Sequence, residues 1–267
     1  MIDDLFMIRE GRFSLDPEAI FGTIPEPICS RVIRRNAMGR IDSDANVFVL
    51  SSNGNYSIID SGVGNIGDPR FREIFQISSL VDLREKLDEN FGISNLRRIL
   101  HTHVHFDHCG NDLALVRGND SRIIMQKKEV ANYRKPNLFT KVSYVRKSMP
   151  PGRVLEIDGV TRIGPDARIL AVGGHTTGHQ VIEFSIRGRK YLHFGDIIPS
   201  SFHIRPNYIP AIDTNPLDTL NLKLKLIRKA IREKSVCIFN HDPVTPAGIL
   251  SGSELKPVLT PFDLAKV

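Results

Sequence analysis

Alternating apolar and polar residues mark a pair of strands near the start of the chain. Residues 45–62 read ANVFVLSSNGNYSIIDSG, with runs rich in β-branched residues on either side of Asn53-Gly54. An Asn-Gly pair between two such runs is typical of the tight turn of a β-hairpin. The pattern therefore predicts an antiparallel hairpin that ends at Asp60.

Helical and strand-like patterns alternate after this hairpin. Apolar residues recur at helical spacing in 81–92, which Gly92 ends, and in a long amphipathic segment over 216–234. A shorter helix is expected over about 126–134. Short apolar runs predict strands at 96–100, 122–125, 167–172, 180–186, 190–195 and 236–239.

Two groups of strands, each followed by helices, indicate an α/β layered fold with two packed sheets and helices outside. No repeat, low-complexity block or long linker marks a boundary, so a single domain is expected over 1–267, with residues 1–43 as an N-terminal lead-in. The lead-in could wrap over the domain or form a subunit contact, and a homodimer is one possible assembly.

Composition favours a cytoplasmic protein with a real core. Apolar residues make up 41% of the chain, no run of about 18 apolar residues occurs, and the start MIDDLFMIREGRF lacks the pattern of a signal peptide. The three cysteines, Cys29, Cys109 and Cys237, form no CxxC pair, which fits a reduced compartment. The net charge of +6 would suit nucleic acid, but the basic residues are dispersed, so we expect neither a nucleic acid nor a membrane as partner.

The densest group of polar residues follows the strand predicted at 96–100, where the sequence reads LHTHVHFDHCG. His103 and His105 would lie on one side of an extended segment, so both imidazoles can approach one ion. Asp107 and His108 lie one turn further on, where the chain swings towards a second ion. Imidazole together with carboxylate favours zinc or a similar borderline divalent metal.

Three further candidates each come directly after a predicted strand. They are His175 in GGHTTGH, Asp196 in FGDIIP and His241 in NHDP. Ligands at the ends of separate strands can converge on one edge of a sheet sandwich. Five histidines and two aspartates suffice for two ions bridged by one carboxylate.

These motifs, in this order, resemble the metallo-β-lactamase superfamily of hydrolases. The resemblance runs from Asp60 in IIDSG through HVHFDH, GGHTTGH and FGD to NHDP. It implies an αββα four-layer sandwich of two mixed sheets, and a supporting role for Asp60 behind the ligand loop. The ligand set that it implies is His103, His105 and His175 for the first ion, Asp107, His108 and His241 for the second, and Asp196 as the bridge between both.

A narrower resemblance points to a reaction. The segments REGRFSLDPEAIFGTIPEPI and GDIIPSSFHIRPNYIPAIDTNPLDTL are similar to the branch that contains quorum-quenching lactonases and methyl parathion hydrolase-like enzymes. The implied activity is hydrolysis of an ester or lactone, or of a phosphotriester, with two divalent ions that activate water. Zinc is the expected metal, with Mn²⁺ or Fe²⁺ as alternatives. Asp107 and Asp196 are the expected catalytic residues, and Asp107 would orient the water or carry a proton to the leaving group.

The substrate pocket is less clearly marked. Some lactonases place a tyrosine three residues after the bridging aspartate, where this chain has Pro199. Tyr208 or His203 in the following loop could supply the missing hydrogen-bond donor, and Phe202 could line the pocket. His179, which closes GGHTTGH, is expected to buttress that loop.

Two residues beside the candidate ligands are expected to be structural, and three other functions fit the sequence less well. His101 is expected to make a structural hydrogen bond, and Cys109 to pack as a small residue. An RNA or phosphodiester nuclease of the same fold is an alternative, although no nuclease-specific domain is inserted. A di-iron redox protein fits poorly, because such relatives carry a carboxylate where His105 stands. A non-catalytic protein that binds a small signal molecule would be expected to lose ligands, and this chain keeps all seven.

Overall fold

The computed structural model describes residues 1–79, 81–144 and 149–266. The strands of the first sheet are β1 (Asp4–Leu15), β2 (Ile41–Ser52), β3 (Asn55–Ile59), β4 (Ser78–Ser79), β5 (Leu96–Leu100), β6 (Arg122–Gln126), β7 (Val154–Ile157) and β15 (Ala265–Lys266). Those of the second are β8 (Val160–Ile163), β9 (Ala167–Ala171), β10 (Gln180–Ile186), β11 (Arg189–His193), β12 (Val236–Ile238), β13 (Ala247–Ser253) and β14 (Lys256–Pro261).

The helices connect these strands. They are α1 (Pro17–Phe21), α2 (Glu26–Val32), α3 (Pro69–Ile74), α4 (Leu83–Phe91), α5 (Phe106–Cys109), α6 (Asp112–Leu115), α7 (Lys127–Arg134) and α8 (Pro216–Glu233). Short 3-10 turns are η1 (Ile93–Asn95), η2 (Lys141–Ser143), η3 (Gly195–Ile197) and η4 (Ser201–Ile204).

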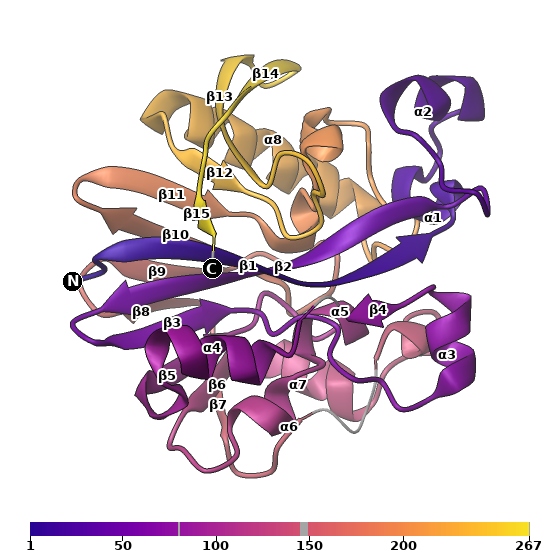
Figure 1. Cartoon of the computed structure of the whole chain (residues 1–267). Helices are drawn as coiled ribbons and strands as arrows, with labels where there is room; N and C mark the ends of the chain where they lie inside the picture. Colours follow the sequence, from indigo (N-terminus) through magenta and orange to yellow (C-terminus); the bar gives the residue numbers. More distant parts are fainter. Residues whose placement is uncertain (80, 145–148, 267) are drawn as a thin grey trace.

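The two sheets pack face to face, and helices cover their outer sides (Figure 1). The first sheet has the order β15-β1-β2-β3-β5-β6-β7, with β4 beside β1, and the second has the order β14-β13-β12-β11-β10-β9-β8. Each sheet mixes parallel pairs, such as β3 with β5 and β11 with β12, with antiparallel ones. The predicted αββα four-layer sandwich is confirmed.

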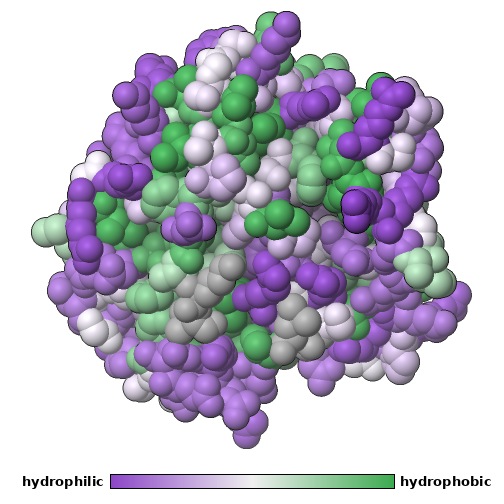
Figure 2. All heavy atoms as spheres, turned by 45° about the horizontal axis from the view of Figure 1, so that its top comes forward, coloured by the Kyte–Doolittle hydropathy of each residue, from purple (hydrophilic) through white to green (hydrophobic). Residues whose placement is uncertain are grey.

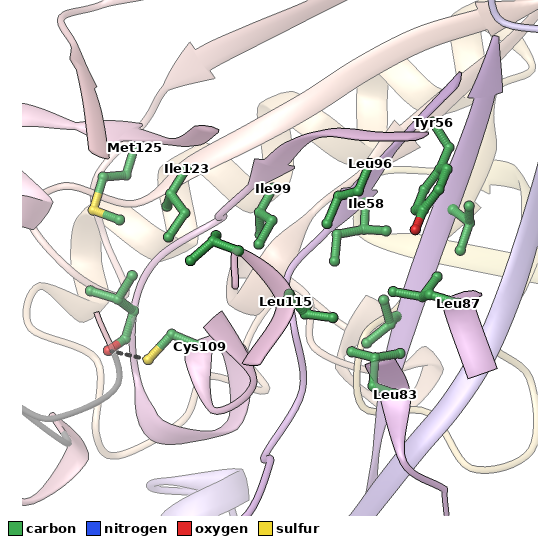
Figure 3. Packing of buried hydrophobic residues seen from close by; sticks show 14 of the residues in the cluster. Tyr56, Ile58, Leu83, Leu87, Leu96, Ile99, Cys109, Leu115, Ile123 and Met125 are labelled. Atoms are coloured by element: carbon green, nitrogen blue, oxygen red, sulfur yellow. Dashed lines mark hydrogen bonds between the residues drawn. The ribbon is translucent and has the colours of Figure 1, made fainter. Parts of the chain in front are cut away.

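Three apolar layers stabilise this arrangement. Phe48 and Ile59 of the first sheet pack against Ile182 of the second between the sheets. On the outer side of the first sheet, Ile99 lies in a cluster with Leu87 of α4 (Figure 3). The residues of α8 pack in the same way on the outer side of the second sheet. Burial of this apolar surface is the main favourable contribution to folding.

The hairpin predicted around Asn53-Gly54 is confirmed. Ser52 pairs with Asn55, so the turn has two central residues, with φ values of 48° and 72°. Positive φ at both central positions is the backbone of a type I′ turn, which Asn and Gly tolerate best. The local sequence therefore fixes the register of β2 against β3.

Strand β1 lies inside the predicted lead-in, where the sequence pattern did not indicate a strand. It pairs with β2, and the register shifts between Arg9 and Gly11. The shift forms a bulge at Glu10, whose buried carboxylate accepts hydrogen bonds from the backbone N–H groups of Val63 (2.8 Å) and Gly64 (3.0 Å). The bulge interrupts the alternation of side chains from which a strand is predicted.

The other predicted helices and strands are also confirmed. The helices correspond to α4, α7 and α8, and the strands to β5, β6, β9, β10, β11 and β12. Strands β7, β8, β13 and β14 were not predicted from the sequence. The face in Figure 2 carries hydrophobic patches among hydrophilic side chains. In the part of the chain that the structure describes, no helix combines the length and apolarity needed to cross a membrane.

Strand direction places the polar loops together. Strands β3, β5 and β6 run parallel, and β9, β11 and β12 share one direction in the second sheet. The loops that follow β3, β5, β9, β11 and β12 carry Asp60, the HVHFDH motif, His175, Asp196 and His241. These side chains meet at one edge of the sandwich.

Candidate metal centre

Three histidines form a group that could hold one metal ion, the first ligand group. His103 and His105 lie in the loop after β5, and His175 follows β9; their ligand nitrogens all lie within 4.8 Å of one another. His105 Nδ1 is 3.1 Å from His175 Nε2, and His103 Nε2 has no hydrogen-bond partner. All three side chains are buried.

Two aspartates and two histidines form the second group. Asp107 and His108 belong to the short helix α5, Asp196 to η3, and His241 to the turn after β12. Their ligand atoms also lie within 4.8 Å of one another, and the Nε2 atoms of His108 and His241 are 3.0 Å apart. The residues that the sequence placed after separate strands thus come together in these two groups.

Asp196 faces both groups. Its Oδ2 lies 3.5 Å from His175 Nε2 and 3.9 Å from His103 Nε2. Its Oδ1 lies 3.1 Å from His241 Nε2 and 3.5 Å from His108 Nε2. One carboxylate can therefore contribute an oxygen to each of two ions.

The donor set fits a divalent cation in each group. Burial, reinforced by neighbouring histidines, lowers the pKa of His103 and of His105 well below the usual range, so both offer neutral nitrogen lone pairs. Burial also acts on His108, but the carboxylates around it outweigh burial and raise its pKa. Nitrogens 3 Å apart repel unless a proton or a cation lies between them. Imidazole and carboxylate ligands in this arrangement suit zinc.

Asp60 supports the second group from behind. Its carboxylate accepts hydrogen bonds from His108 Nδ1 (2.8 Å), Asn240 Nδ2 (2.8 Å), and the backbone N–H (2.8 Å) and hydroxyl (2.9 Å) of Thr102. Burial raises its pKa, but His108 and His101 outweigh burial and lower it, so the group stays ionised. The Nδ1 proton of His108 is thereby fixed, and Nε2 is left to face Asp196.

Two supporting contacts had no signal in the sequence. Asp213 accepts a hydrogen bond from Nδ1 of His175 (2.7 Å), and the backbone oxygen of Asp44 accepts one from Nδ1 of His241 (2.9 Å). Each contact directs Nε2 of its histidine towards the centre. Asp213 stands 38 residues from its partner, and although it lies in the segment GDIIPSSFHIRPNYIPAIDTNPLDTL, the resemblance of that segment gave it no role, so only the folded chain identifies it.

His179 and His101 lie next to the ligands and support them. His179 Nε2 accepts a hydrogen bond from the backbone N–H of Asp196 (3.0 Å), and burial with His175 nearby lowers the pKa of His179 to about 3. His101 lies 2.9 Å from Asp112. Burial lowers the pKa of His101, but Asp112 and Asp60 outweigh burial and raise it to about 9. The structural hydrogen bond expected for His101 is confirmed.

Cys109 also has the packing role that the sequence predicted. Its side chain is fully buried in the apolar cluster outside the first sheet, where Figure 3 shows it. Its thiol donates to the backbone oxygens of His105 (3.3 Å) and Val104 (3.6 Å). Cys109 is a member of neither group of candidate ligands.

A cavity of about 230 Å³ opens over the ligand groups. Its wall includes ligand residues of both groups, such as His105, Asp107 and Asp196, and side chains of α1, η2 and η4. Most of the wall is apolar. The apolar lining residues include Phe13, Leu15, Ile20, Ile33, Ile41, Phe75, Phe106, Val142, Phe202, Pro210 and Ile212.

The loop after Asp196 supplies part of this wall. Phe202 and His203 line the cavity, whereas Tyr208 is buried beside Phe21 in a neighbouring apolar cluster and is not among the described lining residues. The structure thus brings the first two predicted pocket residues to the cavity and places the third outside it. Pro199 also lines the cavity and offers no side-chain donor.

The hydrogen bonds of His203 fix its proton. Burial, with Lys223 nearby, lowers the pKa of His203 to about 3, so its ring is neutral. Nε2 lies 3.0 Å from the backbone oxygen of Ile20, which can only accept, and Nδ1 lies 2.8 Å from Oγ of Ser200. Nε2 therefore carries the proton and Nδ1 accepts from the serine hydroxyl. His203 has no remaining proton for a substrate oxygen.

Two packed mixed sheets with outer helices define an αββα fold, and two clusters of His and Asp side chains that could each hold a metal ion lie at its shared edge. The sequence model described as the Metallo-beta-lactamase superfamily matches residues 40–239. The chain belongs to the metallo-β-lactamase superfamily. No curated protein sequence matches it.

Several solved structures share this fold at low sequence identity. A probable metal-dependent hydrolase from Staphylococcus aureus is 23% identical with a TM-score of 0.88, over 98% of this chain and 99% of that chain. The hydrolase AbOPH is 18% identical with a TM-score of 0.79, over 99% of both chains. AidC, described as a dizinc quorum-quenching lactonase, is 15% identical with a TM-score of 0.77, over 99% of this chain and 96% of that chain.

Proposed function

We propose that this protein is a metal-dependent hydrolase with two divalent ions, with zinc as the expected metal, that cleaves an ester or lactone bearing an apolar substituent. The observation that carries the proposal is the position of Asp196. Its two carboxylate oxygens face two complete ligand groups at the base of an apolar cavity. The lactonase and hydrolase neighbours of the same fold support the reaction class.

The ions would supply Lewis-acid chemistry, which activates water and polarises a carbonyl oxygen near neutral pH. The residues of the chain would transfer the proton and bind the substrate. Asp107 lines the cavity beside both His108 and His241, so its carboxylate can take a proton from water and return it to the leaving oxygen. The apolar wall would bind the substituent and exclude water, which strengthens every electrostatic contact at the base of the cavity.

The test is a metal-dependent activity screen. Protein stripped with a chelator and reloaded with Zn²⁺ is assayed on lactones, aryl esters, phosphotriesters and phosphodiesters, beside an Asp196→Ala variant whose fold is checked by circular dichroism. We expect lactones or aryl esters to be hydrolysed, and activity to vanish on chelation, to return on reloading and to be lost in the variant. Turnover that survives chelation, or full activity in the variant, would contradict the proposal. Tight binding of an acyl lactone without turnover by the fully loaded protein would favour a signal-binding role.

The cavity does not favour a nuclease. Arg40 is the sole lysine or arginine among the described residues of its wall, and Arg40 pairs with Asp16 at 3.2 Å. A phosphodiester backbone is bound largely through lysine and arginine contacts to phosphate. An uncharged substrate fits this wall better, and preferred cleavage of phosphodiesters in the same screen would overturn that choice.

A further inference from the structure

A buried glutamate on α7 joins the loops that carry the first ligand group. Glu129 is fully buried, and its Oε1 accepts hydrogen bonds from the backbone N–H of Val104 (3.2 Å) and the hydroxyl of Tyr144 (3.1 Å). Its Oε2 accepts from the hydroxyl of Thr176 (2.6 Å) and, more weakly, from Nδ2 of Asn132 (3.5 Å). Four donors converge on one carboxylate, three of them from segments outside α7.

Two of these donors are next to the histidines of the first group in the sequence. Val104 stands between His103 and His105, and Thr176 directly follows His175. Through Val104 and Thr176, Glu129 therefore holds the two chain segments that supply the whole three-histidine group. None of the four members of the second group is adjacent in sequence to a described donor of this carboxylate.

Tyr144 extends the same contact to the cavity wall. Its ring packs edge-on against His105, with 5.0 Å between ring centroids, and the preceding Val142 and Ser143 line the cavity. Burial, reinforced by the charge of Glu129, raises the pKa of Tyr144, so the phenol stays protonated and donates. Glu129 thus restrains His105 through two contacts: the backbone N–H of Val104 and the hydroxyl of Tyr144, whose ring packs on His105.

Gly178 shows how closely the second ligand loop lies against α7. A Cβ atom added at Gly178 would lie 2.2 Å from the backbone nitrogen of Glu129, a distance that no side chain tolerates. The glycine therefore lets the loop of His175 reach the start of α7, where Thr176 meets the carboxylate.

We propose that Glu129 is the positioning residue of the first ligand group, and that it sets the affinity of the three-histidine group for its ion without acting on the second. The inference rests on the proposed two-ion function. Partners that orient metal ligands from behind change metal affinity by about 10–100-fold when they are removed. Asp60 has the corresponding direct contact in the second group, through Nδ1 of His108.

The decisive variant is Glu129→Leu, which keeps the side-chain size and removes every acceptor. Glu129→Gln is the rescue variant, because its amide oxygen can still accept from Val104 and Tyr144, while its NH₂ can donate to the hydroxyl of Thr176. Glu183→Leu is the matched control, because Glu183 is a mostly buried carboxylate of β10 that pairs with Arg168 outside the ligand groups.

Each protein is dialysed against a competing chelator, bound metal is counted by elemental analysis, and Co²⁺-loaded samples are compared by visible absorption. For Glu129→Leu we expect one retained ion per chain and an affinity about 10–100-fold weaker for the other. Two ions of native affinity are expected in Glu129→Gln and Glu183→Leu. Because Glu129→Leu can fail to fold, which circular dichroism reveals, Thr176→Val provides a milder break of one link and should weaken one ion by a smaller factor.

The outcomes separate the inference from the proposed function. If the wild type binds two ions and hydrolyses substrate, but folded Glu129→Leu and Thr176→Val keep both ions at native affinity, the inference alone is wrong. Equal loss of both ions in Glu129→Leu also overturns it, because the effect would not be confined to the first group. If the wild type binds no ion at all, the proposed function fails as well.

Discussion

Asp60→Asn should separate folding from metal binding. Asp60 has a φ of 57°, a left-handed backbone conformation in which asparagine and aspartate are the best-tolerated side chains after glycine. The substitution therefore adds little backbone strain, and its effect comes from one carboxylate oxygen that becomes an NH₂ group. The hydrogen bonds that are lost depend on which of the two oxygen positions the NH₂ group takes.

The structure favours the NH₂ at the position of Oδ2. At Oδ1 it would oppose the backbone N–H of Thr102, a donor that cannot reverse. At Oδ2 it would face the Thr102 hydroxyl, Asn240 and His108. The hydroxyl can accept, and Asn240 can turn its partnerless Oδ1 inward. His108 can accept at Nδ1 only if its proton moves to Nε2, the nitrogen that faces Asp196.

The magnitudes follow from these contacts. Hydrogen bonds to a charged group contribute about 1.5–3 kcal/mol each, and the rearranged network loses one or two of them, so the free energy of unfolding should fall by about 2–4 kcal/mol. That is less than the roughly 5–15 kcal/mol by which domains are stable, and the variant should fold. A proton on Nε2 of His108 blocks its lone pair, so the second group should bind its ion about 10–100-fold more weakly.

The assay combines urea unfolding with metal titration against a competing chelator. Asp166→Asn is the matched control, because Asp166 accepts a hydrogen bond from the backbone N–H of Ile2 (3.1 Å) in the N-terminal region, outside both ligand groups. We expect the control to keep two ions of native affinity and Asp60→Asn to keep one. A folded Asp60→Asn with two ions of native affinity would refute the claim that Asp60 fixes the proton of His108.

Three further predictions concern residues outside the two ligand groups. Asp213→Ala removes the acceptor for Nδ1 of His175, and it should weaken one ion by about tenfold in a chelator competition; native affinity would contradict this role. Burial lowers the pKa of Lys223 to about 7, so between pH 7 and 10 the unfolded chain binds a proton that the folded chain does not, and stability should rise with pH. Between pH 7 and 10 the free energy of unfolding of the wild type, measured in urea, should rise by on the order of 3–4 kcal/mol relative to that of Lys223→Met. If the free energies of the two proteins change in parallel with pH, the lowered pKa of Lys223 is excluded. Gly178→Ala should lower stability by about 1–3 kcal/mol through its contact with Glu129, and an unchanged melting temperature would show that the loop has room for a methyl group.

Local patterns predicted those parts of the fold whose signals are themselves local. The Asn53-Gly54 turn, the amphipathic α8 and the short apolar strands each carry their information within a few residues. Strand β1 could not be predicted in this way, because the bulge at Glu10 breaks its alternation. Strands β7, β8 and β14 consist of exposed and half-buried positions with no fully buried one, so they lack the buried apolar runs that mark the central strands.

The ligands were predictable for a similar reason, whereas most of their supports were not. All seven candidates lie in short motifs that directly follow apolar, strand-like runs, and this position can be recognised in the sequence. Glu129 lies in KKEVANYR, a charged segment that looks like the solvated face of any surface helix. Its burial appears only when chain segments up to 47 residues away are folded against it. Residues that lie far apart in the sequence have no fixed spacing, so their contact cannot be predicted from one sequence.

Asp196 faces both ligand groups, which differ in charge. The first group adds three imidazoles to that carboxylate; Asp213 accepts from Nδ1 of His175, and Glu129 accepts from the backbone N–H of Val104 between His103 and His105. The second group adds Asp107 to the shared carboxylate, so it presents two negative charges and two imidazoles. Nitrogen-rich sites select zinc, whereas carboxylate-rich sites also accept harder ions such as Mn²⁺. The two groups are therefore chemically unequal, and we expect Mn²⁺ to replace zinc more readily in the second group than in the first.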